Sequence, residues 1–278
     1  MTSTRKCAAD GSWERLEELE SGARRKVSSQ LEAFSTAFQK TYEAGVIVPV
    51  LRANGKARID VRCPTLFFKR VLNDLRSVWV LLQIGYTSQA ASVAAALHEN
   101  ALATICLTIS TANLESFLKS ENGDIPWSPM QMCRMIVRSE GHLPPSKDYK
   151  NGWRSLYAQY VWLCQSKHPT AESVVHDTTA SQLDSGDYVV MALPNVRPPD
   201  IPFKATVAVM ALYRTLDAIK AFASALGYPN ALPEDYGFAS RVATAKDAAW
   251  AAYSPFLKTQ NPISIARSWF PKKYPPVQ

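Results

Sequence analysis

The chain has 278 residues, of which 47% are apolar and 20% are charged, and its net charge is +7. This composition is typical of an ordinary globular protein and excludes a disordered or fibrous one. Five widely separated cysteines include no CxxC pair, which argues against a zinc framework and favours a reducing cytoplasm. The four histidines lack metal-ligand spacing and no phosphate-loop or dinucleotide motif occurs, so neither a metal nor a cofactor is expected.

The N-terminal region is predicted to form one long helix within residues 1–45. Apolar residues recur there at helical spacing on a narrow stripe, and Gly45 follows the last periodic residue. Residues 46–63 read VIVPVLRANGKARIDVRC, in which two β-branched runs flank an Asn-Gly pair. Because Asn-Gly is a strong two-residue turn signal, a small β-hairpin is expected near residues 46–62.

The middle of the chain, residues 64–258, shows one helical pattern after another. Pro64 favours a helix start, and the pattern that follows it ends near Gly85. The alanine-rich segment 86–110 comes next with almost no linker, which predicts an antiparallel pair of helices. Further helical patterns occupy residues 149–167, 203–227 and 238–258.

The expected fold class is all-α, a single domain over residues 1–278 built as a multi-helix bundle with one small β-hairpin insertion. A basic, proline-rich tail follows at residues 259–278. The segment 86–110 is long enough to span a membrane, but His98 and Glu99 interrupt its middle and alanine is a weak membrane anchor. We therefore expect a buried helix of a cytoplasmic protein that has no membrane partner.

Polar residues inside these apolar helices form the first candidate site. An ionised carboxylate in the middle of such a helix needs a partner, because burying it unpaired is very costly. Two helices that turn near Gly85 would bring together Asp74, Arg76, His98 and Glu99. This cluster is either a polar contact that fixes the helix register or a ligand-binding pocket in the bundle core.

Positive charge is concentrated near the C-terminal end of the sequence. Six Lys or Arg residues and a single acid, Asp247, fall between Arg241 and Gln278. The candidate nucleic-acid-binding residues in this stretch are Arg267, Trp269, Lys272 and Lys273. An acidic partner such as nucleic acid would fit this charge and its aromatic neighbours, and the alternative is a solvated basic tail.

The helical pattern at residues 149–167 is followed directly by His168 and Pro169. A histidine at a helix end is favoured by the helix dipole, and the proline behind it disfavours continuation of the helix. Helix termination therefore accounts for His168, and the alternative is a catalytic role.

Two short motifs resemble a large bacterial family of all-helical proteins known as a domain of unknown function. The first is AASVAAALHENALATICL at residues 90–107, in which Glu99 matches the glutamate of the family. The second is LYAQYVWLCQSKHPT at residues 156–170. Its matching residues are Tyr160, Leu163 and His168. The resemblance adds Tyr160 to the expected ligand pocket.

The resemblance covers residues 64–225 and departs from the family at one position. Ala95 stands where the first motif has an arginine, so Arg76 or Arg154 would have to supply that charge. The family is similar to the HEPN class of helical bundles, which implies an association with nucleotides or RNA. Catalytic members of that class cleave RNA without metal, using a histidine at a fixed short spacing after an arginine. No arginine of this chain has that spacing.

These observations favour a non-catalytic helical module that binds a nucleotide, RNA or a partner protein in a bacterial stress or phage-defence system. The first alternative is a metal-independent ribonuclease of the HEPN type. In it His168 would be the general acid or base and Arg154 or Arg76 would stabilise phosphate charge. The second alternative is a structural module that forms a homodimer through the N-terminal helix.

Overall fold

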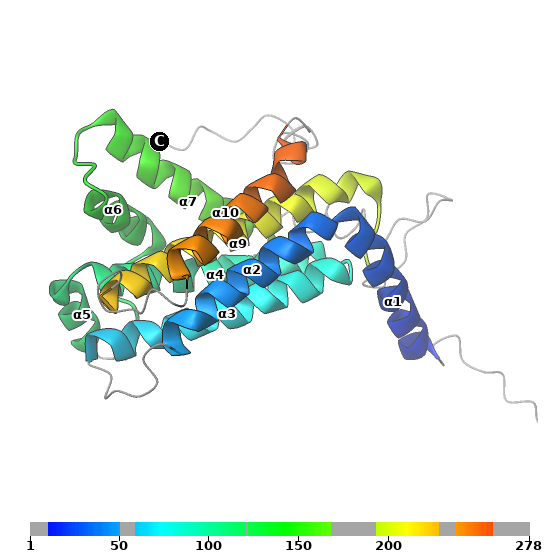
Figure 1. Cartoon of the computed structure of the whole chain (residues 1–278), viewed down its shortest axis with the longest axis horizontal. Helices are drawn as coiled ribbons and strands as arrows, with labels where there is room; N and C mark the ends of the chain where they lie inside the picture. The colour runs from blue at the N-terminus through cyan, green and yellow to red at the C-terminus, as the bar shows by residue number, and fades with distance from the viewer. Residues whose placement is uncertain (1–10, 51–58, 121, 168–192, 228–236, 258–278) are drawn as a thin grey trace, which may run out of the picture.

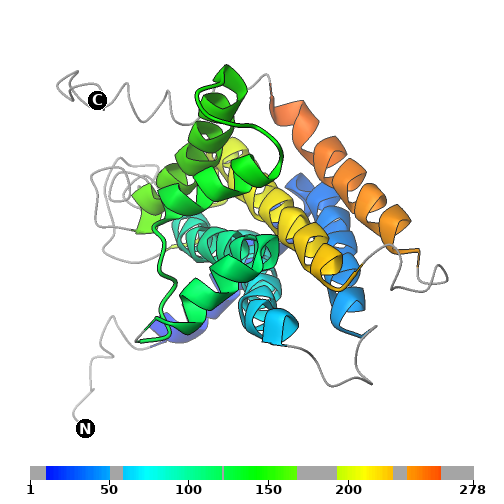
Figure 2. The ribbon, with the colours of Figure 1, turned by 90° about the vertical axis from the view of Figure 1, so that its left-hand side faces the viewer.

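The computed structural model describes residues 11–50, 59–120, 122–167, 193–227 and 237–257, and these residues form α-helices and short 3-10 turns without a β-strand. The helices are α1 (Ser12–Gln30), α2 (Glu32–Val50), α3 (Ile59–Gln83), α4 (Thr87–Ile109), α5 (Thr111–Leu118), α6 (Pro129–Ser139), α7 (Lys147–Lys167), α9 (Ile201–Ala225) and α10 (Phe238–Tyr253). In the bundle, α3, α4 and α9 pack together at the centre (Figures 1 and 2). The pair α2 and α10 covers one side, α6 and α7 cover the other, and α1 projects from one end.

The antiparallel pair α3 and α4 is confirmed, and it turns at Gly85 with a left-handed φ of 89°. Glycine suits this conformation because it has no Cβ to clash with the backbone. All the alanines on α4 except Ala96 are buried, and their small side chains let the neighbouring helices approach closely. On the other face of α3, Phe68 stacks on Phe222 of α9 with ring centroids 4.8 Å apart. Burial of such side chains is the main stabilising term, about 1.5–3 kcal/mol each.

The predicted β-hairpin near residues 46–62 is wrong. Helix α2 continues to Val50 and α3 begins at Ile59, so both flanks of the expected hairpin are helical. The Asn-Gly pair falls in 51–58, outside the described residues. Val48 is fully buried in the core. This burial outweighs the modest preference of β-branched residues for strands.

The expected single helix over residues 1–45 is two helices, because α1 and α2 are separated at Leu31. The backbone of Leu31 leaves helical geometry, with φ −120° and ψ 28°, while its side chain stays buried. Gly45 lies inside α2 and does not end it. A Cβ at Gly45 would lie 2.5 Å from Cδ2 of Leu72, so glycine allows α2 to approach α3. Pro64 likewise lies inside α3 and does not begin it.

Within the described part of the chain, α4 is the single helix that is long and apolar enough to cross a membrane. In the bundle, 67% of its apolar stretch is buried against other helices, as in the core helix of a soluble protein. The cytoplasmic location stays a prediction.

Candidate functional site

The helices α6 and α7 pack closely on each other, and local sequence features fix how they begin and meet. Ser128 and Gln131 form a capping box at the start of α6, in which each side chain accepts a hydrogen bond from the other residue's backbone N–H. Gly152 of α7 lies against Val137 of α6, and a Cβ there would be 3.0 Å from the Val137 Cγ1. The glycine therefore allows the two helices to approach closely.

The outward faces of this helix pair carry a strongly basic set of side chains. Arg134 and Arg138 lie one turn apart on α6 and are both exposed. Lys147, Lys150 and Arg154 share the exposed face of α7, at helical spacing. We call the following residues the α6–α7 surface: Arg134, Arg138, Lys147, Tyr149, Lys150, Trp153 and Arg154. The acids between Pro129 and Lys167 are only Glu140 and Asp148, so this part of the chain is markedly positive.

Aromatic rings hold three of the arginines on this surface. The Arg134 Cζ lies 4.5 Å from the centroid of the Trp153 ring, and the Arg154 Cζ lies 5.5 Å from the same ring. The Arg138 Cζ lies 5.7 Å from the ring of Tyr149. Cation–π contacts of this kind restrain a guanidinium while its N–H groups remain exposed to solvent. The surface thus combines basic side chains from α6 and α7 with two aromatic rings of α7.

A second polar site lies where α7 crosses the middle of α4. The Tyr160 hydroxyl donates a hydrogen bond of 2.5 Å to the Glu99 Oε1, and the Lys167 Nζ lies 3.5 Å from the same oxygen. Burial raises the pKa of Tyr160, and its hydrogen bonds with Cys164 and Glu99 raise it further. Tyr160 therefore remains a protonated donor at neutral pH. The structure brings Glu99 and Tyr160 together, as the predicted pocket requires.

His98 lies beside this site but points into the core. Its side chain is fully buried, and neither ring nitrogen has a hydrogen-bond partner. Its ring centroid is 5.9 Å from that of Tyr160. Burial lowers the pKa of His98 well below 6.5, and the positive charge of Arg214 on α9 lowers it further. The imidazole is therefore neutral and is available neither as an acid nor for contact with an external ligand.

The expected cluster of Asp74, Arg76, His98 and Glu99 does not form. Asp74 accepts a hydrogen bond of 3.2 Å from the Asn100 Nδ2, and burial raises the pKa of Asp74. Arg76 is exposed on α3 and has no contact with Glu99. The carboxylate of Glu99 does have partners, but both come from α7. Glu99 has partners among the described residues, but Arg76 is not one of them, and the Glu99 side chain is 36% exposed where the sequence pattern predicted burial.

Several predicted site residues lie outside the described part of the chain. They are His168, Arg267, Trp269, Lys272 and Lys273. Arg154, the second residue of the ribonuclease alternative, is exposed on α7 beside Trp153. Arg134, Arg138 and Trp153 were not among the site residues predicted from the sequence. The available signal was the pair of arginines one helical turn apart in CRMIVR and the interleaving of basic and aromatic residues in KDYKNGWR.

The described cysteines do not form a reactive centre. Cys63, Cys106, Cys133 and Cys164 are free and buried, as expected of small apolar side chains. Burial raises the pKa of Cys106 and of Cys133 to about 12, which leaves little nucleophilic thiolate near pH 7. Among the described residues, no group of three His, Cys, Asp or Glu side chains could hold a metal ion.

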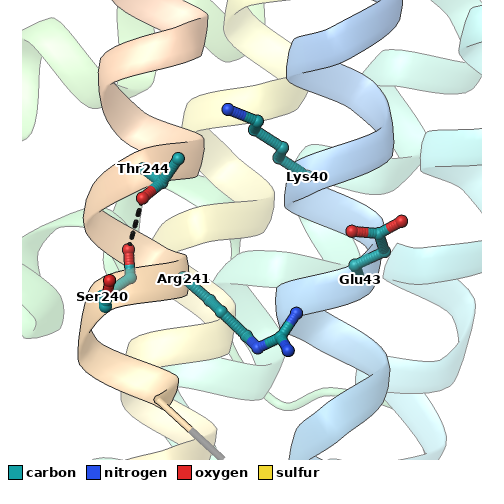
Figure 3. Close-up of a pocket in the computed structure, with 5 residues that line it drawn as sticks. All are labelled: Lys40, Glu43, Ser240, Arg241 and Thr244. Carbon is teal, nitrogen blue, oxygen red and sulfur yellow. Dashed lines mark hydrogen bonds between the residues drawn. The ribbon is translucent and has the colours of Figure 1, made fainter.

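An open groove between α2 and α10 is a weaker candidate site. Figure 3 shows Lys40 and Glu43 of α2 facing Ser240, Arg241 and Thr244 of α10 across it. The Thr244 hydroxyl is already used in a hydrogen bond of 2.7 Å to the Ser240 carbonyl. With two basic side chains and one acid, the groove carries much less positive charge than the α6–α7 surface.

A buried ion pair holds the N-terminal end of α9 against the start of α4. The Lys204 Nζ is paired with the Asp200 carboxylate and donates a hydrogen bond of 2.7 Å to the Asn195 carbonyl. The Thr87 hydroxyl donates to the Asp200 Oδ2 at 2.6 Å. Lys204 is fully buried and Asp200 is 6% exposed, so no substrate reaches this cluster. Its role is to fix the helix ends.

Comparisons with known proteins found no match: no protein-family model, curated protein or solved structure matches the chain.

Proposed function

We propose that the protein is a non-catalytic helical module that binds nucleic acid through the α6–α7 surface. The observation that supports this most is the contact of two arginines, Arg134 of α6 and Arg154 of α7, with the single ring of Trp153 on α7. Exposed arginines held by aromatic rings, with lysines around them, match the chemistry of a phosphodiester chain. Arginine N–H groups bind phosphate oxygens in pairs, and lysines add charge along the strand.

The α6–α7 surface suits nucleic acid better than the Glu99 site does. Glu99 is already occupied by Tyr160 and Lys167, and its carboxylate would repel a phosphate. The α6–α7 surface presents basic side chains on both helices. These five Lys and Arg residues outnumber the two acids in the same part of the chain, Glu140 and Asp148. Binding should therefore be dominated by phosphate contacts and should weaken steeply as salt increases.

The test is a titration of a labelled oligonucleotide over a range of salt concentrations, with EDTA present. The variant Arg138→Gln/Lys147→Gln/Lys150→Gln removes three charges from the surface but leaves the Trp153 contacts in place. We expect the affinity to fall and the slope of log K against log salt to decrease in magnitude by about 2, at about 0.7 for each lost contact with a single strand.

The matched control removes three charges from α1, which projects from the opposite end of the bundle (Figure 1). Arg24, Arg25 and Lys26 are exposed there, so their change to Gln alters the net charge equally. An equal loss of affinity in the two triple variants would contradict the proposal, because it would reflect net charge alone.

A third variant tests the C-terminal candidates Arg267, Lys272 and Lys273, each changed to Gln. If this variant alone loses binding, the basic tail is the binding surface and the proposal for α6 and α7 is wrong. The same titration tests the ribonuclease alternative, because cleavage in EDTA would shorten the oligonucleotide. We expect an intact oligonucleotide.

A further inference from the structure

The contacts around Trp153 go beyond what phosphate binding needs. Lysines or freely moving arginines are sufficient to neutralise a phosphate backbone. Here Arg134 and Arg154, from different helices, both lie within 5.5 Å of the centroid of one indole ring. Both arginines are exposed residues, and the ring contact restrains each guanidinium. Such a restrained planar group is a stacking partner for a nucleobase.

A second aromatic-supported arginine lies close to the first. Arg138 follows Arg134 by one turn of α6, a rise of about 6 Å, and it is held by Tyr149. Gly152 keeps α7 close enough to α6 for both ring contacts to form. The surface therefore offers two neighbouring guanidinium groups that are restrained by rings, with the lysines Lys147 and Lys150 beside them for the connecting phosphates.

Base pairing decides which nucleic acid can use these groups. In a duplex the base faces are covered by the neighbouring bases, so a protein meets mainly phosphates and groove edges. In a single strand the bases can turn outward and stack on aromatic rings or guanidinium planes. We propose that the α6–α7 surface selects single-stranded nucleic acid, whose unpaired bases stack on Arg134 and Arg138. This inference rests on the proposed nucleic-acid binding and specifies its substrate class.

The test compares three probes: a labelled single strand, the duplex formed with its complement, and heparin as a polyanion without bases. The key variant is Arg134→Lys, which keeps the positive charge and removes the planar group. We expect the parent to bind the single strand at least about tenfold more tightly than the duplex. The variant should lose about tenfold in affinity for the single strand, equivalent to about 1.4 kcal/mol, and should keep its affinity for the duplex and heparin.

Two further measurements separate stacking from misfolding and from charge. Arg134 is exposed, so Arg134→Lys should leave the urea unfolding midpoint unchanged, whereas Trp153→Leu also removes packing against α6. The variant Arg24→Lys on α1 serves as the control, because it makes the same exchange at an exposed arginine outside the α6–α7 surface.

The outcomes are distinct for the two proposals. Equal binding of single strand and duplex, with no effect of Arg134→Lys, would overturn the stacking inference and leave the proposed function standing. Weak binding of every nucleic acid with strong binding of heparin would overturn both. An equal loss for all three probes in Arg134→Lys would also overturn the inference, since the arginine would then act through phosphate or sulfate contacts alone.

Discussion

The buried pair Asp200 and Lys204 allows a sharp test of the energetics of this bundle. The substitution Asp200→Asn keeps the size of the side chain and an oxygen for Thr87 but removes the negative charge. Lys204 is fully buried, and its remaining described partner would be the Asn195 carbonyl. Leaving one ion of a buried pair without its counter-charge costs about 3–5 kcal/mol. We expect the free energy of unfolding of Asp200→Asn to fall by that amount at about pH 7.

A second substitution distinguishes the loss of pairing from the loss of packing. Adding Lys204→Met removes the uncompensated ammonium and fills the same space with an apolar chain of similar length. The double variant should recover most of the loss, because replacing both members of a buried pair is often nearly neutral. About 1 kcal/mol should remain lost, since the Asn195 carbonyl no longer has its donor.

The pH dependence gives an independent check on the same reasoning. Burial lowers the pKa of Lys204 from 10.5, and the charge of Asp200 opposes that shift. Without Asp200 the pKa of Lys204 should fall further. At a pH between this lowered value and 10.5, the unfolded chain then binds a proton that the folded chain releases. The free energy of unfolding of Asp200→Asn should therefore rise towards that of the parent as the pH approaches 10.5.

Urea unfolding of the parent, the single variant and the double variant, at about pH 7 and about pH 9.5, measures these differences. A loss below about 1 kcal/mol for Asp200→Asn would show that the lysine finds solvent or another partner. A double variant less stable than the single variant would refute the claim that an unpaired charge is the cause.

Two further predictions concern His98 and Gly85. The pKa of His98 lies well below 6.5, so below pH 6.5 the unfolded chain binds a proton that the folded chain does not, and the parent should lose stability as the pH falls. The variant His98→Leu should flatten this part of the dependence of unfolding free energy on pH, measured by urea unfolding. An unchanged slope would count against a neutral buried ring. Gly85→Ala should destabilise by about 2 kcal/mol or more, and Gly123→Ala by about 1 kcal/mol. Both glycines have positive φ, but of the two only Gly85 has a close neighbour, because a Cβ there would lie 2.9 Å from the Pro194 Cβ. Equal losses of stability in thermal or urea unfolding would contradict the claim that this contact adds to the cost at Gly85.

The long apolar helices could be predicted from the sequence because their signal is continuous. The alanine-rich segment that became α4 has no internal stop, and a glycine precedes it at the turn. The separation of α1 from α2 could not be predicted in this way, since Leu31 is a good helix former. Its buried side chain packs in the core while the backbone changes direction, and that choice depends on tertiary contacts.

The errors near residues 46–62 have the same origin. Val46 and Ile47 pack against the bundle and Val48 is fully buried, so tertiary burial decides their conformation and the local β-branched pattern does not. For the candidate site, the need of Glu99 for a partner was inferred from its place in the middle of an apolar helix, although its side chain is 36% exposed in the structure. The identity of the partner could not be inferred in the same way, because Tyr160 lies 61 positions further along the chain and meets Glu99 only once α7 packs on α4.

Helix α7 links the two polar regions of the molecule mechanically. Trp153 and Arg154 lie in its first half, and Tyr160 and Lys167, which hold Glu99, lie in its second half. The 21-residue helix is about 32 Å long, and both regions lie on this one continuous helix. A change in the tilt of α7 at the Glu99 contact would therefore also move Trp153 and Arg154, which lie about two turns away on the same helix.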